Sequence, residues 1–501
     1  MTSLQEDHSK AFFKSSNLLA DSALADTVTF SRIGKAARLD NIAKNLESLN
    51  LHTSSKTIAN PVAVVQDFSH LRFCFGPNPF QTMLSRSSIP ALLGILVILA
   101  FHGECTAQEW PRFRGPNGSG IGNLSGLPEE IKESDYSWKV LLPGPGHSSP
   151  VLWGEKLYLT AIAEGNERLV LCIDPLTGGT LWTWKETVAA HNLHQFNNFA
   201  SATPTADERA VYLVWGSGER TEALALDHEG NLLWRREWPA FSSDHGFGAS
   251  PMLCDGVLVV HTDSVKEKSS KVMGLDPASG KTLWELSRPT IEEDRKHLTA
   301  YNTPVRVEVA GEPVLVVFQT NDGWRGLDPI TGSEYWHWPG AYKLRSVGSL
   351  IAAENLVFAS VGEGGNGKEG TALRLNADGP PEVAYSLGIS DGLSYVTTPL
   401  FHEGLLYLWA DGGVLTCLDA ASGTRLYRER VGGNFFSSPI IADGKILCCS
   451  REGELVMVRL GPEFSIVSRS LLGASIQATP AIALNRLFVR TEDSLICIAG
   501  K

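Results

Sequence analysis

From about residue 136 to the C-terminus, apolar residues fall in short runs that alternate with polar positions or are rich in β-branched side chains. Segments 169–173 and 271–275 are examples, and each has the composition of a β-strand. Asp and Gly residues punctuate these runs. Asp accepts hydrogen bonds from nearby amides and Gly tolerates the left-handed conformation, so both favour tight turns. The pattern predicts a chain of short strands and hairpin turns.

One turn pattern recurs along the chain: Leu/Ile-Asp, two or three variable residues, Gly, and then an apolar residue followed by Trp or Tyr. The copies occupy residues 173–182, 275–284, 327–336 and 418–427, with a shorter-turned copy at 226–234. Self-similarity at a period of about 40–50 residues is the signature of a propeller or solenoid. The aromatic residue carries a large apolar area to the same place in every unit, where we expect it to pack neighbouring blades together.

A second block, Ser/Thr-Pro followed by an apolar strand, marks where each unit begins, because Pro at a strand's first residue needs no ladder donor. The starts are Pro150, Pro204, Pro251, Pro304, the degenerate Leu350, Pro399, Pro439 and Pro480. The fourth strands end near Trp182, Trp234, Trp284, Trp336, Tyr385, Tyr427 and Val467, one fewer than the starts. We therefore expect the strand around Trp138 to complete the last blade and remove the open edge. The prediction is an all-β, eight-bladed β-propeller over residues 108–501.

These turns resemble those of the pyrroloquinoline-quinone-type (quinoprotein-like) propellers, whose eight blades carry the signature Ala-x-Asp-x-x-x-Gly-x-x-x-Trp. The chain also resembles the BamB-type outer-membrane assembly propellers, which share the repeat without the cofactor. Segment 108–118, Gln-Glu-Trp-Pro-Arg-Phe-Arg-Gly-Pro-Asn-Gly, is similar to the mature start of exported bacterial members of this superfamily. The resemblance covers residue 108 to the end. It implies the fold strongly and the activity weakly.

Charge argues against one class of partner. The net charge is −12 and the isoelectric point is about 5.6, without a basic block or an aromatic-basic stripe. Nucleic acid is therefore not expected as the main partner.

Segment 83–107 has the pattern of a secretory signal peptide: a basic start at Arg86, an apolar run over 89–101, and small residues up to Ala107. The run is short for a membrane span. Either Met83 is the true start and residues 1–82 are a misread, disordered upstream segment, or residues 1–82 precede an uncleaved anchor at 89–101. The first predicts an exported protein of the periplasm or cell envelope, the second a membrane-anchored one. Cys105 follows Glu104 rather than a small residue, which departs from the lipid-anchored BamB-type proteins.

Six cysteines in the propeller region are expected to be small buried hydrophobes. The adjacent Cys448 and Cys449 also resemble the vicinal disulfide that lies over the quinone in quinoprotein alcohol dehydrogenases. They sit in an apolar run predicted to be the second strand of blade seven. Neighbouring side chains of a strand point to opposite faces, which argues against a bond between them. Covalent haem is not indicated, since Cys-x-x-Cys-His is absent from the sequence.

Polar residues collect in the segments that precede each inner strand. Loops at equivalent repeat positions of a propeller meet on one face around the central channel, so these residues are the candidate ligand-binding or protein-docking set. They are His147, His194, Asn198, His245, Tyr301, Arg345, Tyr395, Asn434 and Gln477. The alternative is that they satisfy loop backbone groups and line a hydrated channel. No matching set of metal ligands accompanies His191 and His194, so no metal site is predicted. The glycine-rich segment 362–369 is expected to be a hairpin loop of blade five rather than a phosphate loop.

A complete repeat scaffold without a recognisable catalytic set favours a non-catalytic, exported propeller that binds an envelope protein or a small ligand. The alternative is a quinoprotein-like dehydrogenase with pyrroloquinoline quinone and calcium in the channel, in which Arg345 would face a cofactor carboxylate. Such an enzyme needs calcium ligands and an aspartate base beside the cofactor. Asp244 and Asn302 could be nominated for these roles, but the family's calcium-ligand motif maps to no position. A third reading, a membrane-spanning sensor, requires residues 1–82 to be translated.

Overall fold

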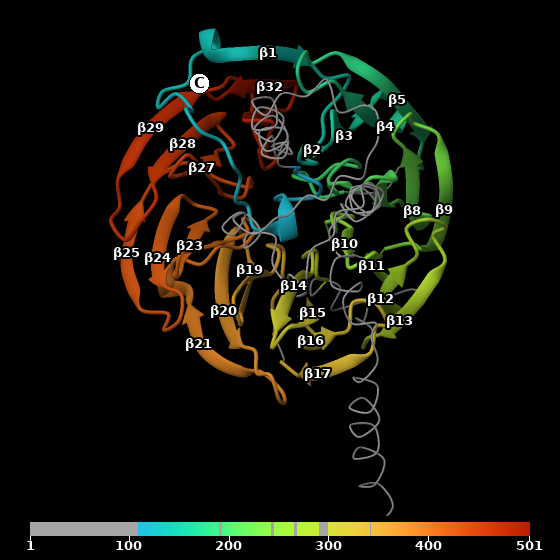
Figure 1. Cartoon of the computed structure of the whole chain (residues 1–501), viewed down its shortest axis with the longest axis vertical. Helices are drawn as coiled ribbons and strands as arrows, with labels where there is room; N and C mark the ends of the chain where they lie inside the picture. Colours follow the sequence, from blue (N-terminus) through green and yellow to red (C-terminus); the bar gives the residue numbers. More distant parts are fainter. Residues whose placement is uncertain (1–108, 190–192, 242–244, 265–267, 290–298, 341) are drawn as a thin grey trace, which may run out of the picture. The chain divides into compact units, whose positions relative to one another are not determined.

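Eight four-stranded antiparallel sheets surround a central channel in the computed structural model (Figure 1). The structure describes residues 109–189, 193–241, 245–264, 268–289, 299–340 and 342–501. All of them belong to one unit, Cys105–Lys501. The predicted eight-bladed β-propeller is confirmed. The predicted signal segment and residues 1–82 lie outside the described residues, and within the described ones no helix is long and apolar enough to cross a membrane.

The blades are numbered in chain order. Blade 1 holds β2 (Val151–Trp153), β3 (Lys156–Ala163), β4 (Glu167–Ile173) and β5 (Thr180–Thr187); blade 2 holds β6 (Thr205–Ala206), β7 (Ala210–Gly216), β8 (Arg220–Asp227) and β9 (Leu232–Pro239). Blade 3 holds β10 (Met252–Cys254), β11 (Val257–Ser264), β12 (Ser269–Leu275) and β13 (Thr282–Ser287); blade 4 holds β14 (Val305–Val309), β15 (Glu312–Gln319), β16 (Gly323–Leu327) and β17 (Glu334–Trp338).

The second half of the ring repeats this order. Blade 5 holds β18 (Ile351–Ala353), β19 (Leu356–Glu363), β20 (Asn366–Arg374) and β21 (Glu382–Gly388); blade 6 holds β22 (Leu400–His402), β23 (Leu405–Ala410), β24 (Val414–Asp419) and β25 (Arg425–Arg430). Blade 7 holds β26 (Ile440–Ala442), β27 (Lys445–Cys449), β28 (Glu454–Arg459) and β29 (Ile466–Leu471); blade 8 holds β30 (Ala481–Ala483), β31 (Arg486–Arg490), β32 (Ser494–Ala499) and β1 (Tyr136–Leu141). Short 3₁₀ turns occur at Pro116–Gly118, Glu133–Asp135, Glu164–Asn166 and Ile389–Asp391.

The ring closes between the two ends of the propeller, as predicted. Strand β1 pairs antiparallel with β32, with Trp138 opposite Cys497 (Figure 1). Every inner strand begins one residue after a predicted start: β2 follows Pro150 and β30 follows Pro480. The degenerate start at Leu350 is also correct, since β18 begins at the next residue. Because β1 fills the outer position of blade 8, no blade lacks its fourth strand.

The outer-strand aromatic residues dock on the turn of the next blade. Hydrogen bonds run from Trp138 to the carbonyl of Pro175, Trp182 to His228, Trp234 to Pro277, Trp284 to Pro329 and Tyr385 to Ala420. The turn glycine lies directly against the indole, so that a Cβ added at Gly280 would fall 2.5 Å from a ring carbon of Trp234. Gly280 also has a φ of +67°, as the turn requires. The predicted packing role of the repeated aromatic residue is confirmed.

The core is divided into layers between neighbouring blades. Val170 of blade 1 packs in one buried cluster with Leu224 of blade 2, and Leu315 of blade 4 packs in another with Val259 of blade 3. The first three strands of a blade are buried nearly throughout, whereas the outer strand alternates, as in the pattern of β5. This layering explains the continuous apolar runs in the sequence, since an inner sheet is covered on both faces.

The six propeller cysteines are free thiols and all are buried, as expected. Cys448 and Cys449 lie side by side in β27, which is a regular strand paired on both edges. Burial raises the pKa of both thiols. Segment 362–369 forms the predicted hairpin, with Glu363 opposite Asn366 across the β19–β20 turn.

Candidate binding site in the central channel

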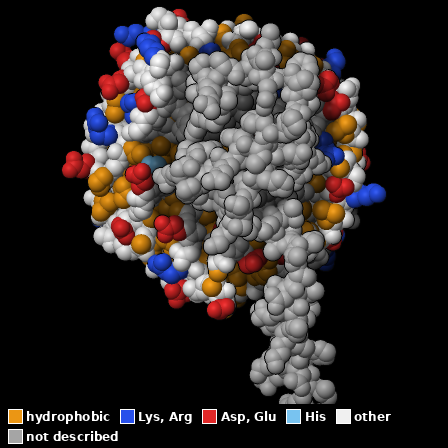
Figure 2. Space-filling model, viewed as in Figure 1, with side chains coloured by type: hydrophobic (Ala, Val, Ile, Leu, Met, Phe, Trp, Pro, Cys, Tyr) orange, Lys and Arg blue, Asp and Glu red, His pale blue; other side chains and the backbone are white. Residues whose placement is uncertain are grey.

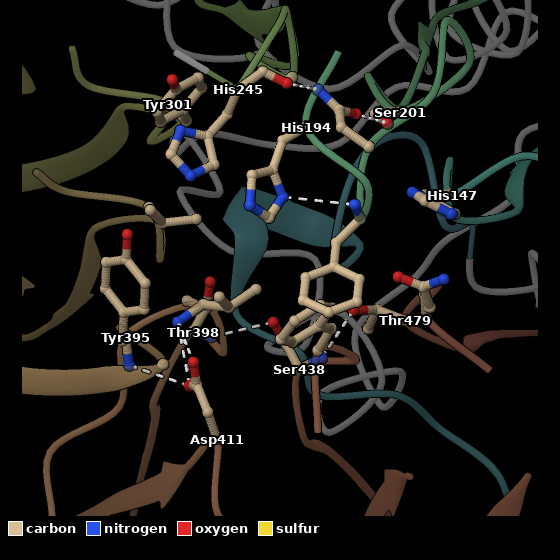
Figure 3. Close-up of a pocket in the computed structure, with 18 of the residues that line it drawn as sticks. His147, His194, Ser201, His245, Tyr301, Tyr395, Thr398, Asp411, Ser438 and Thr479 are labelled. Carbon is tan, nitrogen blue, oxygen red and sulfur yellow. Dashed lines mark hydrogen bonds between the residues drawn. The ribbon is translucent and has the colours of Figure 1, made fainter. Parts of the chain in front are cut away.

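The channel widens into a cavity of about 920 Å³ on the face that carries the loops between blades (Figure 3). Its wall contains two kinds of loop: those that lead into each inner strand and those that join the second and third strands of a blade. Apolar and polar side chains both line it, which is the composition of small-molecule sites.

Eight hydroxyl side chains, one from each blade, form a ring around the cavity. They are the residues of the Ser/Thr-Pro starts: Ser149, Thr203, Ser250, Thr303, Ser349, Thr398, Ser438 and Thr479. Seven of the eight hydroxyls accept a hydrogen bond from the backbone N–H of the neighbouring ring residue, at 2.9–3.1 Å. The ring therefore ties adjacent blades together at the axis.

The structure brings most of the predicted site residues to this cavity. Those that line it are His147, His194, His245, Tyr301, Arg345, Tyr395, Asn434 and Gln477. Asn198 does not line it, because its side chain turns back to accept the N–H of Ala200 at 2.8 Å and caps its own loop. Whether the cavity residues bind a ligand stays a prediction. His191 and Asp244 lie outside the described residues, and Asn302 is buried against the carbonyl of Phe318.

Two histidine-bearing loops meet above the ring. The imidazoles of His194 and His245 stack with centroids 4.5 Å apart, and His245 also meets Tyr301 edge to face (Figure 3). Arg345 places a guanidinium nitrogen 2.7 Å from Nε2 of His245. One side of the mouth is therefore a cluster of aromatic rings joined to a cation.

Arg451, which the sequence reasoning missed, lies next to this cluster, because Phe196 contacts both His194 and Arg451. Its guanidinium carbon lies 4.3 Å from the ring centroid of Phe196 and 4.5 Å from that of Phe436. Such cation–π contacts fix the orientation of the guanidinium. Arg451 belongs to the loop between β27 and β28, and the sequence analysis considered only the loops that precede inner strands. The loop after the second strand of each blade also reaches the cavity, and comparing its equivalent positions across the blades could have identified Arg451 from the sequence.

Asp411 is a second residue that the sequence reasoning missed, and it occupies the same kind of loop in blade 6. Its carboxylate accepts the backbone N–H groups of Tyr395 and Val396 at 3.0–3.2 Å (Figure 3). Burial raises the pKa of Asp411 to about 7, although these N–H groups favour the charged form. Asp411 thus holds the loop of blade 6 in place and is only partly charged near neutral pH.

The wall behind the ring is cationic. Burial lowers the pKa of His147 to about 4, and the nearby charges of Arg490 and Arg451 act in the same direction. Arg490 is itself buried and donates to the carbonyls of Ser148 and Thr160. His147 is therefore neutral at physiological pH.

The N-terminal segment of the propeller closes the other end of the channel. The chain from Trp110 to Gly122 crosses the centre of the ring (Figure 1). Its anchors are a backbone bridge from Trp110 to Leu152, and hydrogen bonds that join Pro111 to Ala206, Arg112 to Pro304, Arg114 to Pro439 and Gly122 to Ile441. Phe113 lines the cavity floor. The segment predicted as a mature start is thus a plug, and we call residues 110–122 the plug segment.

The cavity does not fit the calcium ion that a quinone dehydrogenase requires. Calcium takes six to eight oxygen ligands. Among the described residues, two carboxylates line the cavity: Asp411, whose oxygens already accept amides, and Glu363 on the tip of a hairpin. Within the described residues, no three His, Cys, Asp or Glu side chains are grouped as metal ligands. The volume, Arg345 and Arg451 suit an anionic organic molecule, but the described part of the lining offers calcium no group of carboxylate ligands.

Outside the cavity, acidic, basic and apolar side chains are interspersed around the visible rim (Figure 2).

Known proteins share the propeller fold of this chain. The family model described as outer membrane protein assembly factor BamB matches residues 136–308 and 386–460. The crystal structure of BamB from Moraxella catarrhalis superimposes with a TM-score of 0.52 at 14% identity, covering 73% of this chain and 97% of that one. The quinohemoprotein alcohol dehydrogenase of Comamonas testosteroni gives 0.52 at 13%, covering 79% and 81%, and the enzyme ADHIIG of Pseudomonas putida HK5 gives 0.51 at 10%, covering 79% and 81%. The curated proteins contain no match.

The sheet topology and these superpositions define the class as an eight-bladed β-propeller. Within that class, this chain is similar to the BamB-type assembly propellers, whose family model matches it in two segments.

Proposed function

We propose that this protein is an exported, non-catalytic binding platform of the cell envelope, whose loop-rich face engages an envelope protein or a small ligand around the central cavity. The observation that carries the proposal is the cavity itself. It is lined by residues from every blade, it is closed below by the plug segment, and its aromatic and cationic side chains are held in place by neighbours. The match to the BamB family model supports a protein partner and an envelope location.

Site-specific photo-crosslinking tests this proposal. A photoreactive residue is placed in the producing cell at Gln195 or Asn366, which are exposed on the cavity rim. The matched positions are Glu354 and Glu403, which are exposed in the turns on the opposite face. Mass spectrometry of the purified protein should find a protein or small-molecule adduct at the rim positions and none at the other two. Adducts confined to the opposite face, or absent from all four, would overturn the proposal.

The second candidate is a dehydrogenase that uses pyrroloquinoline quinone and calcium. It is favoured by the likeness to quinohemoprotein alcohol dehydrogenases and by the size of the cavity, and it is disfavoured by the missing calcium donors. The full chain, incubated with quinone and calcium, should not reduce an artificial electron-acceptor dye when alcohols or aldose sugars are supplied. Quinone-dependent dye reduction at a substantial rate would replace the platform with the enzyme.

A further inference from the structure

The ring of hydroxyl groups has unused donors that face the cavity. Each hydroxyl oxygen that accepts a neighbour's N–H keeps its own O–H hydrogen to donate. Among the described residues, none of the eight ring hydroxyls donates to a protein acceptor. Thr398 and Ser438 are each 1% exposed and Thr479 is 3% exposed. A buried donor without an acceptor is unfavourable, so the ring is suited to a ligand that brings acceptor atoms.

Two buried arginines of the plug segment lie next to this ring. Arg112 is 5% exposed and donates to the carbonyl of Pro304, the residue after ring member Thr303. Arg114 is fully buried and donates to the carbonyl of Pro439, the residue after Ser438.

Nε and Nη1 of Arg112 and of Arg114 have no hydrogen-bond partner in the described part of the chain. Burial lowers the pKa of the two groups to about 10 and about 9, and both remain charged at neutral pH. Neither arginine lines the cavity, whereas Phe113 between them does. Positive charge without a counter-ion is costly in the interior, so these two groups favour a negative ligand in the cavity beside them.

The wall of the cavity adds a third cation. Arg451 lines the cavity beside Ser438 and Gln477, and its Nε also lacks a partner among the described atoms. The two carboxylates in the described lining do not cancel these charges. Asp411 is bound to backbone amides, and Glu363 is exposed on its hairpin. The apolar rings of Phe196 and Phe436 hold the guanidinium of Arg451 over the cavity.

We propose that the central cavity holds an oxyanion-binding site at the hydroxyl ring, in which ring hydroxyls donate to the ligand's oxygens and Arg451 supplies the facing positive charge. The buried Arg112 and Arg114 add positive potential from beneath the cavity. The ligand is a phosphate, sulfate or carboxylate group, either free or carried by a larger molecule. This inference rests on the proposed function and gives its small-ligand form a chemical class. Charge-assisted hydrogen bonds to guanidinium are the strong interactions of such a site.

Isothermal titration calorimetry of the full chain tests the site, at fixed ionic strength, with inorganic phosphate and with phenyl phosphate as probes. Saturable binding is expected for at least one probe. Equal affinity indicates that a free anion is the ligand, whereas tighter binding of phenyl phosphate indicates an anionic group on a larger ligand that also contacts the phenylalanines. Both outcomes support an oxyanion site. No saturable binding of either probe to the folded wild-type chain overturns it.

Two pairs of variants place the site. Arg451→Gln should weaken binding by roughly ten-fold or more, because one charge-assisted hydrogen bond is lost. Arg469→Gln is its control, since Arg469 carries the same charge in β29 of the same blade and pairs with Glu454 outside the cavity. Thr398→Val should also weaken binding and Thr398→Ser should restore it. Thr416→Val is the matched loss of a buried hydroxyl away from the cavity.

The calorimetry and the crosslinking together distinguish failure of the oxyanion site from failure of the proposed binding-platform function. If the Arg451 and Thr398 variants bind phosphate as the wild type does, the oxyanion site is wrong, whatever the crosslinking shows. If neither probe binds while rim adducts persist, the platform stands without this site. If the probes bind and the variants lose binding while no rim adduct forms, the anion site stands and the platform fails.

Discussion

A single turn glycine combines two requirements that explain why the repeat is so visible. At Gly280 the backbone is left-handed, and the indole of Trp234 occupies the space where a Cβ would lie. Asp276 completes the turn, since its carboxylate accepts the hydroxyl of Ser279 and the N–H of Ala278. These hydrogen bonds lower the pKa of Asp276, the bond from Ser279 most strongly. Each residue type in the motif is therefore required for a different physical reason.

The two requirements of Gly280 can be separated by substitution. Gly444 has the same φ of +67° but no atom within 4 Å of its missing Cβ. Gly444→Ala should lower the free energy of unfolding by about 1–2 kcal/mol, the cost of a left-handed Ala. Gly280→Ala should lose about 1–3 kcal/mol more, because its Cβ overlaps Trp234. Urea unfolding followed by tryptophan fluorescence measures both. Equal losses would mean that the glycine is needed for its backbone alone.

At the scale of elements, the closing strand is the feature that makes a ring from a repeat. Strand β1 precedes blade 1 in sequence but completes blade 8, and Trp138 reaches the turn of blade 1 through the carbonyl of Pro175. The hydroxyl ring closes the same gap at the axis, where Thr479 donates its N–H to Ser149. Blade 8 and blade 1 are therefore joined at their outer and inner edges.

Removing the docking residue of β1 should loosen this closure selectively. Trp138→Ala should cost less than the about 3–5 kcal/mol of a fully buried tryptophan, because Trp138 is half-buried, and it should speed amide hydrogen exchange in β32. Trp284→Ala removes an equivalent contact between blades 3 and 4 and is the control. Exchange measured by mass spectrometry should show faster exchange of β32 in the first variant only. The same increase in both variants would show that the blades open together.

At the scale of the whole molecule, the channel buries titratable groups whose effects on stability oppose one another. Burial lowers the pKa of His147 to about 4, below its usual 6.5, so the unfolded chain binds more protons between these values. That group makes the fold less stable as the pH falls from 6.5 to 4. Burial raises the pKa of Asp411 from 3.8 to about 7, so this carboxyl makes the fold more stable as the pH falls from 7 to 3.8.

Substitution of His147 should isolate its share of this balance. In His147→Gln, the free energy of unfolding should fall less between pH 7 and pH 5 than in the wild type, because the proton that His147 binds on unfolding is absent. Urea titrations at the two pH values measure the difference. His402→Gln, in blade 6 away from the cavity, is the control variant. If the free energy of unfolding changes between the two pH values as much in His147→Gln as in the wild type, the fold does not lower the pKa of His147.

The sequence by itself determined the strand starts, the docking turns, the blade number and the closure by the strand around Trp138. These follow from local rules, since a turn needs its glycine and a strand start accepts its proline, and the period repeats them. The sequence also indicated which loops reach the channel, and eight of the nine residues chosen from them line the cavity.

Only the tertiary structure decided what the channel contains. Arg451 and Asp411 enter from loops that look like ordinary hairpins in sequence, and the plug segment brings Arg112 and Arg114 against blades 4 and 7. Asn198 is a polar loop residue like the other eight candidates, but its side chain accepts a backbone N–H of its own loop instead of facing the cavity. Contacts between residues hundreds of positions apart depend on how the ring closes. Local sequence patterns do not determine such long-range contacts. For this reason the fold was predicted more completely than the site.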